Sequence, residues 1–313
     1  MYYRIREGGI PLPLADFKAA VQAEQYQTAR WLFVQLRDDP LVSREELAEA
    51  YCEAAVVEYR AGHLRTAIAW AKVAIKMAMA PETNQLMLLS RTALNLIEFQ
   101  RLAGDTAAAI DTGHHWLTHY GDNREVAHRK GRFYFNLAVT HQQREEVEKA
   151  LEHYELAWNH LAGVRSSHPD ASERERSLVY EVMALQNSAW LMYEVDLGVA
   201  KEIAGKARRL IPEGNSLLAR EQMLLEALEI HKCGDSVSVL ALVNRIFANA
   251  TAIPTRQLFW LYWLAAKELV RCGKMSTANA YAAMATQAAE DAKDRRLIRL
   301  GREVEEETDG VAS

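Results

Sequence analysis

A small residue recurs at a nearly constant interval along this chain of 313 residues, each time at the same place in a helical pattern. The copies, which are separated by 38, 42, 41, 50, 39 and 39 residues, are Ala29, Ala67, Ala109, Ala150, Ala200, Val239 and Ala278. Self-similarity at such a period indicates a solenoid of helix pairs, because each pair covers its apolar face only by stacking on its neighbours.

Two further columns of apolar or small residues keep step with the first. Four residues later come Phe33, Ala71, Gly113, Tyr154, Ala204, Val243 and Ala282, and seven residues later come Leu36, Ala74, Trp116, Ala157, Ala207, Ile246 and Ala285. These spacings place all three columns on one face of a helix, and small side chains let neighbouring helices approach closely. Five residues before the first column, glycine ends the preceding helix at Gly62, Gly104, Gly234 and Gly273.

Apolar spacings of three and four, with seven prolines in the whole chain, predict helices nearly throughout and no strands. The first helices of successive pairs are predicted at 14–24, 44–61, 83–103, 124–143, 174–194, 217–232 and 255–272. The second helices are predicted at 26–37, 64–79, 106–119, 146–161, 197–210, 236–249 and 275–291. The polar stretch GVRSSHPDASER, residues 163–174, is predicted to be a long loop that accounts for the 50-residue step.

Two segments carry a family resemblance. YFNLAVTHQQREEVEKALEHYELAW and LQNSAWLMYEVDLGVAKEIAGKARRLIP resemble tetratricopeptide (TPR) repeats, and the resemblance covers roughly residues 14–290. It implies an all-α solenoid of about seven antiparallel helix pairs wound into a right-handed superhelix. The repeats are longer than the usual 34 residues, as in the TPR arrays of bacterial regulators that sense peptides. We expect an N-terminal extension at 1–13, a repeat domain at 14–292, and a capping helix with an acidic tail at 293–313.

Bulk composition restricts the classes of partner and compartment. A formal charge of −5 and a pI near 6.1 argue against direct nucleic-acid binding, which needs concentrated Lys and Arg. The three cysteines, Cys52, Cys233 and Cys272, form no C-x-x-C motif and suit a reducing compartment. The longest apolar run, at 258–266, is too short to span a bilayer, and no secretory signal is visible. We therefore expect a cytoplasmic protein with no membrane partner.

The TPR resemblance also implies where a partner binds. In such arrays the first helix of each pair faces a concave groove that holds extended peptides or protein segments. Carried onto this chain, the groove-facing set is Glu49, Glu53, Arg91, Asn95, Glu98, Arg132, Asn136, Gln143, Gln186, Ala189, Tyr193, Trp260, Trp263 and Lys267. We expect a protein- or peptide-binding scaffold or sensor, acting in bacterial regulation or signalling.

The motif R-x-x-x-N occurs twice in that set, as Arg91 with Asn95 and as Arg132 with Asn136. The i, i+4 spacing puts both side chains on one side of the helix. An asparagine offers both a donor and an acceptor to a peptide backbone, and an arginine can fork onto a carboxylate. The alternative is that each arginine pairs with a neighbouring carboxylate of the chain and each asparagine satisfies a backbone carbonyl.

Trp260, Trp263 and Lys267 form a single stripe at i, i+3 and i+7. The stripe can serve as an aromatic pocket for an apolar ligand side chain, since aromatic residues are favoured anchors at interfaces. A second interpretation, which we favour, is that the C-terminal helix covers it with Leu297, Ile298 and Leu300. A symmetric homodimer contact at this end of the chain is the third.

Catalytic chemistry finds little support in the sequence. Asp111, His115 and His119 form a ladder on one helix face, but the repeat register places them opposite the core, so we expect them to be exposed and assign no metal or cofactor. His141, His153 and His160 are expected on polar helix faces without a nearby nucleophile. We predict no enzyme. The alternatives are a structural assembly module whose groove is filled by self-association and, as a weaker rival, a metal-dependent enzyme that uses the ladder.

Overall fold

The computed structural model describes residues 14–80, 85–193, 195–212, 225, 235–249, 255–291 and 295–309. Within these ranges the chain is helical with short turns and contains no strand. It forms two compact units, Met1–Arg144 and Glu145–Ser313, which are described separately below. The all-α architecture that was predicted from the repeat pattern is thereby confirmed.

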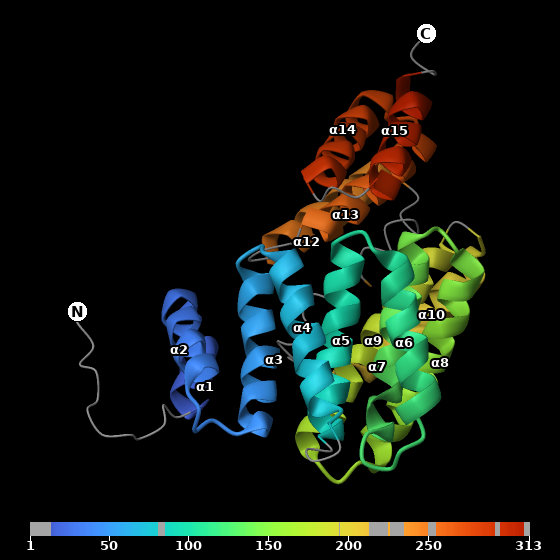
Figure 1. Cartoon of the computed structure of the whole chain (residues 1–313). Coiled ribbons are helices and arrows are strands. Elements are labelled where there is room, and N and C mark those ends of the chain that lie inside the picture. Colours follow the sequence, from blue (N-terminus) through green and yellow to red (C-terminus); the bar gives the residue numbers. More distant parts are fainter. Residues whose placement is uncertain are drawn as a thin grey trace. The chain divides into compact units, whose positions relative to one another are not determined.

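The first unit is a series of helices that pack in chain order. They are α1 (Leu14–Gln22), α2 (Tyr26–Asp38), α3 (Arg44–Arg60), α4 (Leu64–Ala78), α5 (Leu86–Leu102), α6 (Thr106–Tyr120), the short 3-10 helix η1 (Ala127–Arg129) and α7 (Lys130–Gln143). In Figure 1, α3, α4, α5 and α6 stand side by side in sequence order. The first helices also contact one another from pair to pair, α1 with α3, α3 with α5 and α5 with α7. They therefore form a continuous face, which we call the first-helix face.

The second unit repeats this plan, and its α8 and α9 are longer than any helix of the first unit. Its helices are α8 (Val147–Ser167), α9 (Ala171–Met192), α10 (Leu197–Leu210), α12 (Ser236–Asn249), α13 (Thr255–Arg271), α14 (Met275–Asp291) and α15 (Arg295–Asp309). Consecutive elements pack as hairpins, α8 with α9, α9 with α10, and α13 with α14 and α15 (Figure 1). The predicted helix at 217–232 lies outside the described residues except for Leu225, which is buried. The expected extension at 1–13 lies outside them as well.

The three columns that were recognised in the sequence form the core of both units. Every residue of the columns is buried, from Ala29, Phe33 and Leu36 in α2 to Ala278, Ala282 and Ala285 in α14. At Gly113 the packing leaves no room for a side chain, because a Cβ atom there would lie 2.7 Å from Cδ2 of Leu137. The residues that recur at constant spacing in the sequence are therefore the residues that pack in the core.

Five of the described turns between helices of a pair contain a residue with a left-handed backbone. Gly62, Gly104 and Gly273 adopt φ values of +82°, +84° and +70°, as expected for glycines that end helices. Glu24 and Glu145, which stand five residues before Ala29 and Ala150, occupy the same place with φ of 57° and 63°. Gly234 lies outside the described residues. The turn geometry is therefore kept in two repeats that lack the glycine.

The long loop that was predicted at 163–174 is wrong. Helix α8 continues to Ser167 and α9 starts at Ala171, so three residues separate them. The 50-residue step thus comes from longer helices. Apart from the buried Glu173, the polar residues of the stretch are exposed or partly exposed. The break occurs at Pro169, after which the Asp170 carboxylate caps α9 by accepting a hydrogen bond of 2.8 Å from the Ser172 N–H.

Helix α15 packs against α13 and α14. Leu297, Leu300 and Val304 belong to one buried cluster with residues of α13 and α14, and the Arg299 guanidinium lies 2.9 Å from the Glu145 carboxylate.

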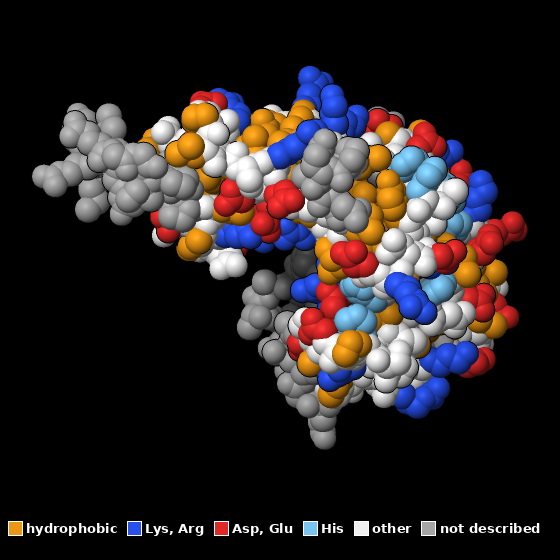
Figure 2. Space-filling model, turned by 60° about the horizontal axis from the view of Figure 1, so that its bottom comes forward, with side chains coloured by type: hydrophobic (Ala, Val, Ile, Leu, Met, Phe, Trp, Pro, Cys, Tyr) orange, Lys and Arg blue, Asp and Glu red, His pale blue; other side chains and the backbone are white. Residues whose placement is uncertain are grey.

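The face of the protein in Figure 2 carries positive and negative side chains next to one another. Among the described helices, none combines the length and apolar character that a membrane crossing requires.

Candidate functional site on the first-helix face

Four charged side chains connect three successive first helices of the first unit. Lys18 Nζ on α1 lies 2.7 Å from Glu49 Oε1 on α3. Arg91 on α5 reaches the same Glu49 carboxylate at 3.7 Å and, through Nη1, Glu53 Oε1 at 2.9 Å. Glu49, Glu53 and Arg91 were all predicted to face a groove, and the structure brings them together on one face. We call Lys18, Glu49, Glu53 and Arg91 the charged row.

Arg91 is held in place and still reaches solvent. Its side chain is 40% exposed, and the buried Cys52 lies beside it on α3. Burial alone would lower the pKa of Arg91, but the neighbouring Cys52, Glu53 and Glu49 raise it above its ordinary value. The guanidinium therefore stays charged and is directed by two carboxylates, while part of its surface remains open to a further acceptor.

The next residues along α5 extend the same face. Asn95 follows Arg91 by one turn and is partly exposed. Glu98 accepts a hydrogen bond of 3.2 Å from the Tyr59 hydroxyl on α3, and burial together with the Glu98 charge raises the pKa of Tyr59. Arg91, Asn95 and Glu98 thus present a cation, an amide and an anion in succession along one helix.

The second R-x-x-x-N motif lies differently in its helix. Arg132 on α7 is only 5% exposed, so its guanidinium is less open to a ligand than that of Arg91. The Asn136 amide donates a 2.9 Å hydrogen bond to the Arg132 carbonyl, which is the alternative role considered for asparagine in this motif. Gln143 is exposed, and its amide lies 3.4 Å from the Arg101 carbonyl. Of the two motifs, the one on α5 is the more accessible.

In the second unit, the expected site residues Tyr193, Trp260 and Trp263 form an aromatic cluster with Trp190, which was not predicted, at the end of α9 and on α13. Trp190 lies 5.2 Å from Trp260, Trp260 lies 5.6 Å from Trp263, and Tyr193 lies 6.0 Å from Trp263, measured between ring centroids. Lys267 places its ammonium 5.0 Å from the Trp263 ring. At this distance the ammonium is attracted to the negative face of the indole.

The chain itself covers much of this cluster. Trp263 is buried in an apolar cluster that also includes Leu297 and Leu300 of α15, whereas Trp260 remains partly exposed. Tyr193 donates a 3.3 Å hydrogen bond to the buried Glu268 carboxylate. Gln186 and Ala189 of α9, which were also predicted to face the groove, are buried.

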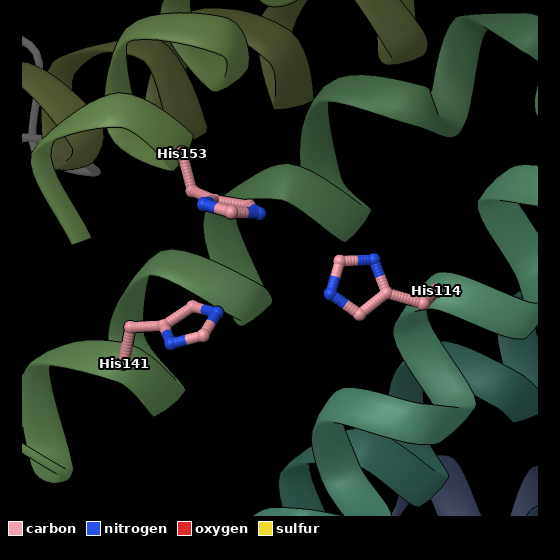
Figure 3. A group of neighbouring side chains, drawn as sticks. All are labelled: His114, His141 and His153. Atoms are coloured by element: carbon pink, nitrogen blue, oxygen red, sulfur yellow. The ribbon is translucent and has the colours of Figure 1, made fainter. Parts of the chain in front are cut away.

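Within each unit taken by itself, the described residues include no group of three histidine, cysteine or acidic side chains close enough to share a metal ion. Asp111, His115 and His119 are exposed, and His119 Nδ1 lies 2.8 Å from the His115 carbonyl. Figure 3 shows His114 of α6 and His141 of α7, both in the first unit, with ring nitrogens within 4.8 Å of each other. The third histidine drawn there, His153, comes from α8 of the second unit. Two imidazoles are fewer than the three or four protein ligands of zinc sites.

His141 also corrects an expectation, since it is buried and does not lie on a polar helix face. It shares a repeat position with Glu58 and Gln100, nine residues before Ala150, Ala67 and Ala109. All three are polar and buried. The sequence analysis missed this column because it expected polar residues on the solvent-exposed surface of the helices. Their common distance from the alanine column was the signal that could have identified them.

Glu58 shows what the buried polar column does in the second repeat. Arg30 of α2 donates to both of its carboxylate oxygens, at 2.6 Å and 2.9 Å, and His63 Nδ1 lies 2.6 Å from Oε2. Burial by itself would raise the pKa of Glu58, but the hydrogen bonds from Arg30 and His63 hold it below its ordinary value. The pair joins the second helix of one repeat to the first helix of the next.

Comparison with known proteins identifies the fold. No protein-family model and no curated protein matches the sequence. The apo form of RapI is similar, with a TM-score of 0.68 at 14% identity over 90% of this chain and 97% of that chain. A Rap protein in complex with Competence and Sporulation Factor gives 0.50 at 12% identity, over 95% and 96%. BtubC from P. vanneervenii gives 0.52 at 18% identity, over 75% and 89%. The chain therefore has a TPR-like helical-repeat fold that resembles the Rap proteins.

Proposed function

We propose that this protein binds an extended segment of a protein or peptide partner on the first-helix face, and that it acts as a scaffold or sensor in bacterial regulation. In the first unit the contacts come from Arg91, Asn95 and Glu98 on α5, with Asn136 and Gln143 contributing from α7. In the second unit, taken by itself, Trp260 offers a partly exposed aromatic surface as a separate candidate contact for an apolar side chain.

The charged row is the observation that carries this proposal. Lys18, Glu49, Arg91 and Glu53 link α1, α3 and α5, and the side chains of Lys18, Glu49 and Arg91 keep 31–40% of their surface exposed. Side chains that are already held in place lose less conformational entropy when a ligand binds. A row of both signs also suits a peptide backbone and its charged groups, because each carboxylate accepts and each cation donates hydrogen bonds.

Asn95 adds the backbone contact. An asparagine amide supplies a donor and an acceptor together, which matches the N–H and C=O of an extended chain. Its place one turn after Arg91 keeps both groups on one side of α5. The likeness to a Rap protein crystallised with Competence and Sporulation Factor supports the use of this fold as a binding scaffold.

A random peptide library displayed on phage tests the proposal without knowledge of the natural partner. Peptides are selected on the parent protein and then titrated against an Arg91→Ala, Asn95→Ala double variant. The matched control is an Arg65→Ala, Lys72→Ala double variant on the exposed surface of α4, a second helix. Circular dichroism verifies that both variants are folded. Both changed positions on α5 are partly exposed, so the fold tolerates them better than a change of the buried Arg132.

We expect the selected peptides to bind the control variant as tightly as the parent, and to lose roughly tenfold in affinity for the α5 variant. The result that argues against the proposal is retention of the peptides by the α5 variant together with their loss by the α4 variant. That pattern would place the binding surface on the second helices.

A further inference from the structure

A cleft with a volume of about 310 Å³ lies between α4, α5 and α6, and none of the residues assigned to the first-helix face lines it. This volume is near the lower end of the range for small-molecule sites. The cleft lies within the first unit. It is independent of the partner-binding proposal, since its lining comes largely from the second helices α4 and α6 together with core residues of α5.

The floor of the cleft is apolar and well packed. Leu89 and Ala93 of α5 and Trp116 of α6 line it, and all three are buried. Trp116 stacks on Phe133 with ring centroids 3.7 Å apart and an interplanar angle of 5°. At the rim, Met79, which directly follows α4, is half exposed. An apolar group in the cleft would therefore cover hydrophobic surface that is now hydrated, and it would meet a floor that is already ordered.

The polar lining is weighted toward negative charge. Asp111 is the acidic side chain of the lining and is exposed, as is the neighbouring His115, and the described lining residues include no lysine or arginine. Thr112 is engaged already, since its hydroxyl donates a 2.9 Å hydrogen bond to the Ala108 carbonyl and lies 3.0 Å from the Gln100 amide group. A cationic group is thus the charge-complementary occupant of this end of the cleft.

The indole N–H of Trp116 is an independent observation that points to a hydrogen-bond acceptor on a ligand. Its side chain is 2% exposed, and its indole N–H has no hydrogen-bond acceptor among the described residues. A buried donor without an acceptor costs free energy, so native proteins rarely leave one. A hydroxyl or carbonyl oxygen of a ligand in the cleft would satisfy it.

We propose that the cleft is a binding site for a small apolar amine that also carries a hydrogen-bond acceptor. The apolar body rests on Leu89, Ala93 and Trp116, and the ammonium pairs with the Asp111 carboxylate. The rings of Trp116 and Tyr120, both of which line the cleft, attract the same cation through their negative faces. The acceptor receives the Trp116 N–H.

Tyramine, which combines an ammonium, one aromatic ring and a phenolic oxygen, is the probe. Tyrosol is its neutral counterpart, with a hydroxyl in place of the amine. Both are titrated into the full-length protein while the indole N–H signals are followed by NMR, and the Trp116 signal is identified by its loss in a Trp116→Phe variant. The charge variant is Asp111→Asn. Its matched control is Glu155→Gln on the exposed surface of α8, in the other unit.

We expect tyramine to shift the Trp116 indole signal and to bind about two- to fivefold more tightly than tyrosol, the range of one exposed ion pair. In Asp111→Asn this preference shrinks to what the rings of Trp116 and Tyr120 provide, while Glu155→Gln retains it in full. Equal binding of tyramine and tyrosol to the parent overturns the proposal, as does a Trp116 signal that stays unmoved at millimolar tyramine. Neither result bears on the peptides selected for the first-helix face.

Discussion

The guanidinium of Arg91 on α5 lies 2.9 Å from the carboxylate of Glu53 on α3, and both side chains belong to the face formed by the first helices of the array. This pair joins adjacent repeats and orients the Arg91 side chain, which remains 40% exposed. Its position gives it two separable roles. One is a contribution to stability, and the other is the presentation of Arg91 to a ligand.

The first prediction concerns the stability role. Arg91→Ala is expected to lower the free energy of unfolding by less than about 1 kcal/mol, because partly exposed ion pairs are screened by water. Urea titration followed by circular dichroism measures this change. A much larger loss would indicate that Arg91 is chiefly a structural residue. In that case the loss of peptide binding by Arg91 variants would no longer report on direct contact.

Close packing between α6 and α7 leads to the second prediction. Gly113→Ala is expected to cost about 1–3 kcal/mol of unfolding free energy, because the added Cβ meets Leu137 Cδ2 at 2.7 Å. Leu137→Ala alone removes a buried side chain and costs about 2–5 kcal/mol. In the double variant the added methyl group occupies vacated space, so the loss should be smaller than the sum of the two. Strict additivity in this double-mutant cycle would contradict the assigned contact.

The third prediction concerns the stability cost of an alanine in a left-handed turn. Gly104 has φ +84° and no atom near an added Cβ, so Gly104→Ala is expected to destabilise the protein by about 1–2 kcal/mol through backbone strain alone. Gly163 is the comparison, since it lies exposed within α8 and its added Cβ also meets nothing. Gly163→Ala should stabilise the protein by up to about 1 kcal/mol. Thermal unfolding of the two variants should therefore shift in opposite directions, and a shift of both in the same direction would contradict this.

The repeat pattern predicted the core well because burial in a solenoid is periodic. Ala67, Ala71 and Ala74 recur in register with their counterparts, and the same register predicted the bounds of most helices. It failed at residues 163–174, where polar composition was taken for a loop although solvated helix surface is polar too. The register also could not show which side chains pair. The carboxylates that hold Arg91 come from a helix about 40 residues earlier in the chain.

The fourth prediction concerns how the buried Glu58 makes the free energy of unfolding depend on pH. Its pKa in the folded protein lies below the ordinary value because Arg30 and His63 stabilise the carboxylate. A depressed pKa contributes stability that is fully present above the unfolded value of about 4.3 and is lost as the pH falls through the folded value. The unfolding free energy of the parent should therefore fall more steeply below about pH 5 than that of Glu58→Gln.

Glu155→Gln serves as the control for this measurement, since Glu155 is exposed on α8. It should retain the steep fall of the parent. Parallel curves for the parent and Glu58→Gln would show that the network of Arg30, Glu58 and His63 does not hold the carboxylate in its ionised form.

Site-specific photo-crosslinking tests the central claim of a ligand on the first-helix face most directly. The photoreactive amino acid benzoylphenylalanine is placed at Asn95 on α5 in one protein and at Lys72 on α4 in another, and each is irradiated with a peptide selected on the parent. We predict that the peptide crosslinks to position 95 and not to position 72. Crosslinking at position 72 with none at position 95 would contradict the account.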